Sequence, residues 1–286
     1  MDDEGTGMTE KTFLTWSPME ADALTIAGRF PAPLMALAEG QVPALILRGA
    51  YPATDCAALM DRFEERGYFD NDSVGGRESQ LSGGPYLDLG TSLGRVGANR
   101  DEFFAHAERT HDLFPRLFEG LTDPVALIYR NLSTLSPGKT VKTAETADGR
   151  RYGPAIFRIY QNEEGHRAHY DSVRRRTKTD IEVARFTHQF AGILCVKKGS
   201  VGGESTIYRA KGEGAVEQAV DDGEFETYAE QNTIPRARVE LNAGDLYFFY
   251  TENIHEVPKA IRSETRVVLA VFIGMSPEDE EIFVWS

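Results

Sequence analysis

The sequence predicts an α+β protein with helices in its first half and a double-sheet jelly roll in its second half. Apolar residues within 101–120 recur at helical spacing, whereas short runs of β-branched and aromatic residues separated by turns begin near residue 154. Hydrophobic residues make up 41% of the chain, which is enough to build a full core. Helices followed by many short strands are typical of this class.

We expect residues 1–18 to form a mobile N-terminus and residues 19–286 to form a single domain. This domain divides into a helix-rich portion, 19–150, and a jelly-roll core, 151–286. In the first portion the pattern predicts a strand over 44–47 and a helix over 56–63, capped by Thr54 or Asp55. A Gly- and Ser-rich loop over 72–100 and helices over 101–120 and 123–134 follow.

The second portion is predicted to consist mainly of strands. They cover 155–160, 190–196, 205–208, 238–241, 246–250 and 266–273. The turn Asn242-Ala243-Gly244-Asp245 is expected to join two of them as a hairpin. Residues 210–235 are acidic and poor in large apolar groups, so they are expected to form an insertion, either a lid or a solvated surface loop.

Charge and cysteine content narrow the class of partner. The chain has 31 Lys and Arg against 45 Asp and Glu, a formal charge of −14 that disfavours nucleic acid and anionic membranes. Cys56 and Cys195 lie far apart and form no metal-binding or disulfide pattern. No signal-peptide pattern and no apolar stretch long enough to span a bilayer is evident. We therefore expect a cytoplasmic protein that binds neither nucleic acid nor membranes, with its oligomeric state left open.

One histidine stands in a pattern with metal-binding chemistry. Of six histidines, His169 alone is followed two places later by an aspartate, Asp171. Residues two apart on a strand share a face, so this imidazole and carboxylate can reach one metal ion. Iron(II) in oxygenases is held by two His and one carboxylate, and His255 is the best candidate for the second His. His166 has no carboxylate at this spacing and is assigned to a loop.

With Arg266 added, the order of motifs resembles the iron(II)/2-oxoglutarate-dependent oxygenase superfamily, in its prolyl-hydroxylase-like pattern. The resemblance covers about residues 154–275. Its segments are Phe157-Arg158-Ile159-Tyr160, His169-Tyr170-Asp171, Gly202-Gly203-Glu204-Ser205-Thr206, Ala243-Gly244-Asp245-Leu246-Tyr247-Phe248-Phe249, His255 and Arg266. Size and layout are most similar to standalone small-molecule hydroxylases, such as N-succinyl-amino-acid hydroxylases, and to related halogenases.

The resemblance implies a cupin-like jelly roll with iron(II) and 2-oxoglutarate as cofactors and O2 as co-substrate. It implies that His169, Asp171 and His255 are the iron ligands. Arg266 would pair with the distal carboxylate of 2-oxoglutarate, and Tyr160 and Thr206 would contact the same cofactor. Relatives often carry Ser or Thr two residues after this arginine, where the chain has Val268. Another hydroxyl would then hold the carboxylate.

The expected reaction is hydroxylation of an unactivated C–H bond in an amino acid or an amino-acid-derived natural product. Halogenating relatives carry Gly or Ala where Asp171 stands, so we expect hydroxyl rather than chloride transfer. Desaturation or ring closure with the same cofactors is an alternative. A cupin-like isomerase or metal sensor, or an inert scaffold, also stays open. The basic run Arg174, Arg175 and Arg176 predicts either contact with an anionic group of the substrate or a solvated face.

Overall fold

Two largely antiparallel sheets organise the computed structural model, which describes residues 16–69, 80–81, 87–94, 99–160, 165–176, 181–199, 204–257 and 265–286. The larger sheet has the order β1-β2-β11-β8-β13-β6-β4-β3, with β14 paired to β13 and β5 paired to β14. Its strands are β1 (Met19–Glu20), β2 (Ala44–Leu47), β3 (Gln80–Leu81), β4 (Leu87–Gly90), β5 (Thr140–Thr143), β6 (Ile156–Tyr160), β8 (His188–Lys197), β11 (Leu246–Tyr250), β13 (Arg266–Met275) and β14 (Glu281–Trp285). The smaller sheet has the order β10-β9-β12-β7, formed by β10 (Arg236–Val239), β9 (Ser205–Lys211), β12 (Asn253–Val257) and β7 (His166–His169).

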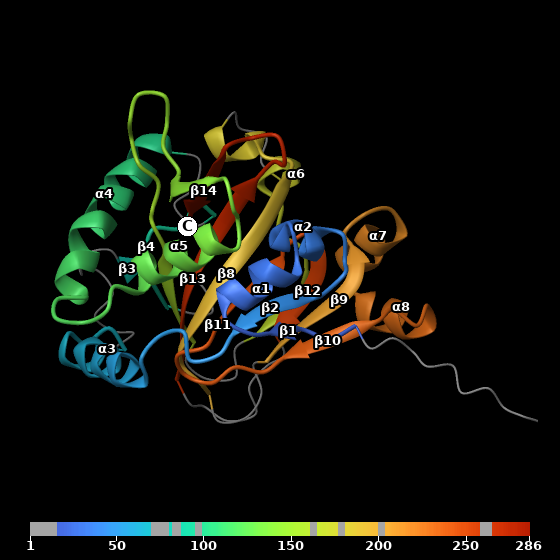
Figure 1. Ribbon diagram of the computed structural model, residues 1–286, viewed down its shortest axis with the longest axis horizontal. Coiled ribbons are helices and arrows are strands. Elements are labelled where there is room, and N and C mark those ends of the chain that lie inside the picture. The colour runs from blue at the N-terminus through green and yellow to red at the C-terminus, as the bar shows by residue number, and fades with distance from the viewer. Residues whose placement is uncertain are drawn as a thin grey trace, which may run out of the picture.

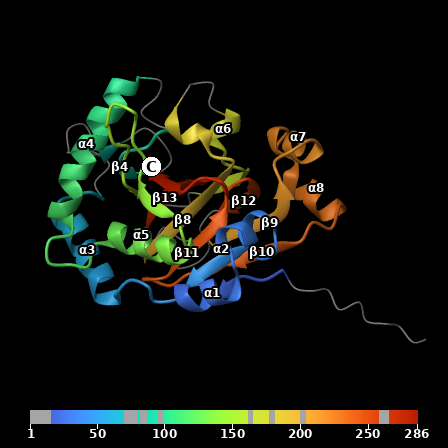
Figure 2. The ribbon, with the colours of Figure 1, turned by 45° about the horizontal axis from the view of Figure 1, so that its top comes forward.

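Helices from the first half of the chain cover one face of the larger sheet (Figures 1 and 2). They are α1 (Ala23–Arg29), α2 (Pro33–Ala38), α3 (Ala53–Glu65), α4 (Arg100–Leu117) and α5 (Pro124–Thr134). Strand alternation divides the sheet's side chains between its two faces. On β8, Phe190 and Leu194 lie in the core beneath the helices, whereas Ala191 and Ile193 line a cavity on the opposite face.

The smaller sheet supplies the other wall of that cavity. Its lining includes residues of β6, β8, β11 and β13 from the larger sheet and of β7, β9 and β12 from the smaller one. The cavity therefore lies between the two sheets.

The expected insertion is largely helical. Residues 210–235 include α7 (Ala215–Asp221) and α8 (Phe225–Gln231), which lie beside β9 and β10 (Figure 1). Phe225 packs edge-on against Tyr208 of β9, with ring centroids 4.9 Å apart. Buried apolar residues thus attach the segment to the smaller sheet, and it is not a solvated loop. A role as a lid stays a prediction.

The turn after β10 does not close a hairpin. Asp245 donates its backbone N–H to the carbonyl of Asn242, so the predicted turn exists. Strand β10, however, pairs with β9 in the smaller sheet, whereas β11 pairs with β2 and β8 in the larger one. The turn therefore carries the chain from one sheet to the other.

Two local expectations in the first portion were wrong. Helix α3 begins after Pro52, with no side-chain cap, and the Asp55 carboxylate instead accepts a hydrogen bond from the backbone N–H of Thr122. Strand β4 lies within the stretch expected to be a loop, and it pairs with β6 beside the cavity. Most of the expected mobile N-terminus, 1–18, lies outside the described residues.

The remaining described helices are short. They are α6 (Val173–Arg176) and a 3-10 helix over Glu182–Arg185. Among the described residues no helix has both the length and the apolar character needed to cross a bilayer.

Candidate metal centre and cofactor pocket

His169 and His255 face each other across two paired strands. They are Cα partners in the antiparallel register of β7 and β12, and their ring centroids lie 4.3 Å apart. Directly opposed residues of an antiparallel pair have side chains on the same face. The strand pairing therefore brings together two imidazoles that are far apart in the sequence.

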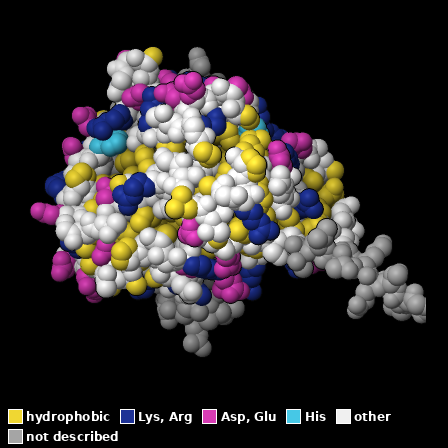
Figure 3. All heavy atoms as spheres, viewed as in Figure 1, with side chains coloured by type: hydrophobic (Ala, Val, Ile, Leu, Met, Phe, Trp, Pro, Cys, Tyr) yellow, Lys and Arg dark blue, Asp and Glu magenta, His cyan; other side chains and the backbone are white. Residues whose placement is uncertain are grey.

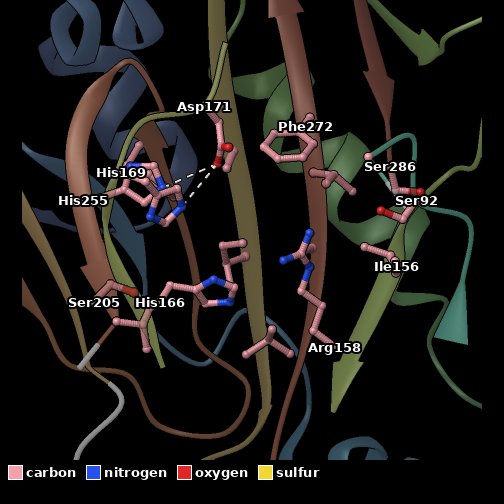
Figure 4. Close-up of a pocket in the computed structure, with 18 of the residues that line it drawn as sticks. Ser92, Ile156, Arg158, His166, His169, Asp171, Ser205, His255, Phe272 and Ser286 are labelled. Atoms are coloured by element: carbon pink, nitrogen blue, oxygen red, sulfur yellow. Dashed lines mark ion pairs between the residues drawn. The ribbon is translucent and has the colours of Figure 1, made fainter. Parts of the chain in front are cut away.

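Asp171 completes the group from the segment just after β7. Its Oδ2 lies 3.7 Å from Nε2 of His169 and 3.6 Å from Nε2 of His255 (Figure 4). One possible ligand atom from each of the three residues lies within 4.8 Å of the other two. Two hydrogen bonds fix the backbone of Asp171. The N–H of Asp171 donates to the carbonyl of Thr251, and the Thr251 hydroxyl donates to the carbonyl of Asp171.

Both imidazoles are held in the tautomer that a metal requires. Nδ1 of His169 lies 2.7 Å from the carbonyl oxygen of Arg167, and Nδ1 of His255 lies 3.0 Å from that of Asn253. A carbonyl can only accept, so each Nδ1 donates its proton and Nε2 keeps its lone pair. Hydrogen bonding of this kind orients the histidine ligands of metal sites. Two imidazoles and one carboxylate fit iron(II).

Electrostatics keep the carboxylate ionised. Burial acts to raise the pKa of Asp171, but a hydrogen bond and charge from His255 and charge from His169, when these rings are protonated, together with the Arg158 guanidinium, hold that pKa below its usual range. An anionic carboxylate is the form that binds a metal cation.

A cavity of about 360 Å³ opens beside the triad. Its lining residues are Ser92, Leu93, Gly94, Ile156, Arg158, Tyr160, His166, His169, Asp171, Ala191, Ile193, Ser205, Tyr247, Phe249, His255, Val257, Arg266, Val268, Ala270, Val271, Phe272 and Ser286. A volume of this size is within the range of small-molecule sites.

Arg266 and Tyr160 lie together on this lining. They are Cα partners in the β13–β6 register, and the Arg266 guanidinium carbon lies 5.0 Å from the Tyr160 ring centroid. The Tyr160 hydroxyl lies 3.2 Å from Nε2 of His166. An arginine fork beside hydroxyl groups is suited to a carboxylate of the cofactor.

A buried pair of hydroxyl groups lies on the same cavity lining as Val268, the position where relatives often carry Ser or Thr. Ser205 Oγ and the Tyr247 hydroxyl lie 3.0 Å apart, and both residues line the cavity, as does Val268. Thr206 is not among the lining residues, because it alternates with Ser205 along β9. A cofactor contact for Thr206 stays a prediction, and the geometry favours its neighbour.

The sequence patterns did not predict two further residues of the cavity lining. His166 begins β7 and lines the cavity, so its assignment to a loop was wrong. Burial, with a smaller contribution from the nearby Arg158 guanidinium, lowers the pKa of His166 to about 3 and keeps this imidazole neutral. Arg158 also lines the cavity. Strand alternation could have identified Arg158, because it lies two residues before Tyr160.

Arg174 and Arg175 of the basic run do not line the cavity. Both residues are on α6. The Arg175 guanidinium pairs with Glu217 at 3.0 Å and lies over the Tyr170 ring at 4.7 Å. The Arg176 side chain lies outside the described residues. A substrate contact by this run stays a prediction.

Comparison with known proteins places the chain in a family. Residues 19–286 match the family model described as carrier-protein-independent halogenase WelO5. No curated protein sequence matches the chain.

Similar solved structures show a shared fold. One is an N-substituted L-amino acid dioxygenase from Burkholderia ambifaria, with 16% identity, a TM-score of 0.57 and coverage of 89% of this chain and 91% of that one. The α-ketoglutarate complex of an enzyme with the same description has 15% identity and a TM-score of 0.55, covering 88% and 90% of the two chains.

Proposed function

Because the chain belongs to the WelO5 family, within the iron(II)/2-oxoglutarate-dependent oxygenases, we propose that it hydroxylates an unactivated C–H bond of a free small molecule. Enzymes of this superfamily use iron(II), 2-oxoglutarate and O2. The observation that supports the proposal is the triad, in which two imidazoles present Nε2 toward a carboxylate beside a cavity. We further propose that the two sheets form the double-stranded β-helix typical of these enzymes.

Each part of the pocket has a distinct task in this proposal. His169, Asp171 and His255 would hold the iron, and Arg266 would bind the distal carboxylate of 2-oxoglutarate, assisted by Tyr160 and the Ser205–Tyr247 pair. When bound, iron, 2-oxoglutarate and O2 supply an oxidant able to break an unactivated C–H bond. The apolar walls around Ile156, Ala270 and Phe272 exclude water and orient the substrate. An amino acid or amino-acid-derived substrate is the class we favour, as in the similar dioxygenase.

The family description favours halogenation as a second candidate. Asp171 argues against it, because its carboxylate lies beside both imidazoles and would fill the coordination position that halogenating relatives leave to chloride. The substrate radical would then recombine with hydroxyl. Desaturation or ring closure would need the same pocket and differ in substrate pose.

The product of the reaction distinguishes these outcomes. A succinate-release screen over free and N-acylated amino acids and their natural-product derivatives would identify a substrate. Mass spectrometry of the product formed in excess chloride is then expected to show a gain of one oxygen. A chlorinated product would refute the role of Asp171, and loss of two hydrogens would favour desaturation or ring closure.

A further inference from the structure

We propose that Arg158 binds a carboxylate of the substrate, so that the enzyme acts on small molecules combining one such group with an apolar body. This inference rests on the proposed function and specifies its substrate class. The anionic group of the substrate would then be bound inside the cavity, and the basic run on α6 would not be needed for this.

The position of Arg158 follows from strand alternation on β6. Phe157 and Ile159 lie in the core beneath the helices, whereas Ile156, Arg158 and Tyr160 line the cavity. Figure 4 shows the Arg158 side chain extending from the strand into this space. A guanidinium within an enclosed cavity can give a bound carboxylate two parallel charge-assisted hydrogen bonds.

The cofactor has a different anchor. In the β13–β6 register Arg266 is opposite Tyr160. Arg158 is opposite Val268, two residues further along the pair of strands. The next inward-facing pair in that direction is Ile156 and Ala270. The distal carboxylate of 2-oxoglutarate needs one guanidinium, and Arg266 beside Tyr160 supplies it. Arg158 would then face the part of the cavity that remains for the substrate.

The walls around Arg158 define the rest of that substrate. Leu93, Ile156, Ala270 and Phe272 line the same cavity and offer apolar surface. Among the lining residues, the charged side chains are Arg158, Arg266 and the metal-binding Asp171. With Arg266 assigned to the cofactor and Asp171 to the metal, we assign the anionic group of the substrate to Arg158, the third charged residue of the lining.

A structural role for Arg158 is the competing explanation. Asp88 of β4 is its Cα partner in the sheet register, is fully buried and does not line the cavity. Directly paired residues share a face, so this carboxylate could simply balance the guanidinium. The test must therefore separate recognition of an anion from stabilisation of the sheet.

Binding of matched acids and amides makes this separation. Wild type, Arg158→Gln, Arg158→Lys and Arg266→Gln would be loaded with nickel(II) and 2-oxoglutarate. They would be titrated by calorimetry with 3-phenylpropanoate and 4-phenylbutanoate and with the primary amide of each. Wild type should bind each acid about tenfold or more tightly than its amide, as expected for hydrogen bonds to a charged group. Arg158→Gln should bring the ratio near one, and Arg158→Lys should restore part of it.

Cofactor affinity and stability serve as controls. Arg158→Gln should leave 2-oxoglutarate affinity intact, whereas Arg266→Gln should lower it and retain the acid preference. The inference is overturned if wild type binds no acid, shows no acid preference, or keeps that preference in Arg158→Gln. It is also overturned if Arg158→Gln loses affinity for 2-oxoglutarate. A purely structural role is shown if Arg158→Gln lowers the melting temperature as much as Asp88→Asn does and keeps the wild-type acid-to-amide ratio.

The same titrations distinguish failure of this inference from failure of the proposed function. If wild type fails to bind 2-oxoglutarate, the oxygenase assignment falls. The acid-to-amide ratio, measured on the nickel-loaded protein alone, then still decides the role of Arg158.

Discussion

At the scale of single residues, the triad is preorganised by backbone atoms. Each imidazole of the triad donates Nδ1–H to a carbonyl two residues earlier in its own strand, Arg167 for His169 and Asn253 for His255. The ring orientation therefore depends on local strand geometry and is set before any metal binds. Preorganised ligands lose less conformational entropy on metal binding.

Arg266→Ala should weaken 2-oxoglutarate binding while iron still binds. The substitution would leave the distal carboxylate of the bound cofactor without its guanidinium partner, so a loss of roughly 2–4 kcal/mol in cofactor affinity is expected. Equilibrium titration of the metal-loaded protein measures it. Arg174→Ala is the matched control, because Arg174 is exposed and does not line the cavity. Equal 2-oxoglutarate affinity in wild type and Arg266→Ala would place the carboxylate anchor elsewhere.

Local spacing predicted the places of some site residues along the chain but not how they come together. His169 and Asp171 share one short motif, and Arg266 opens an apolar strand, so their positions follow from strand alternation. The pairing of His255 with His169 depends on a strand register that no local pattern specifies. The Ser205–Tyr247 pair joins two different sheets, so only the tertiary structure identifies it.

At the scale of elements, hydrophobic periodicity located the long strands and helices but not their partners. β8, β11 and β13 lie where apolar runs predict them, because they are buried on both faces. β4 was missed, since its four residues stand among glycines and serines and are defined mainly by pairing with β6. The hairpin predicted at residues 242–245 was wrong for a related reason, because a turn motif does not determine which sheet each strand joins.

Gly244→Ala should destabilise the turn between the two sheets. Gly244 has φ +91°, and a Cβ there would lie 2.4 Å from the backbone oxygen of Tyr51. Backbone strain together with this clash should cost about 2–4 kcal/mol in the free energy of unfolding. Gly120→Ala is the control, because Gly120 also has a positive φ, +73°, but its added Cβ would meet nothing within 4 Å. Urea unfolding measures both, and equal losses would show that the clash is relieved without cost.

At the scale of the whole molecule, the acidic excess does not gather into one patch on the face seen in Figure 3. Figure 3 shows acidic and basic side chains interspersed on the face it presents. With a formal charge of −14, the long-range field repels anions, so an anionic substrate and an anionic cofactor both need local arginines. The cavity provides them in Arg158 and Arg266.

Stability should fall as the pH drops from about 6.5 to 4, partly through His106. This imidazole is buried, with Nδ1 3.1 Å from the Thr91 hydroxyl, and burial lowers its pKa to about 4. In this window the unfolded chain binds a proton at His106 that the folded protein does not bind. The contribution of His106 to the free energy of unfolding is therefore complete above pH 6.5 and is lost as the pH falls. Its size is on the order of 1–3 kcal/mol.

Replacing this histidine isolates the effect. His106→Gln cannot take up a proton, so its free energy of unfolding should change less between pH 7 and pH 4 than that of wild type. Urea unfolding at several pH values measures both curves. Parallel curves, or a wild type that gains stability on acidification, would show that His106 does not make this contribution.

The central claim is that His169, Asp171 and His255 hold iron(II) beside a 2-oxoglutarate site. Anaerobic titration of the metal-free protein with iron(II) and then 2-oxoglutarate, followed by visible absorption, tests it most directly. We predict a metal-to-ligand charge-transfer band that requires both components, is absent in His169→Ala and His255→Ala, and needs more 2-oxoglutarate in Arg266→Ala. A wild-type protein that shows no band, or a band that survives loss of either histidine, would contradict the account.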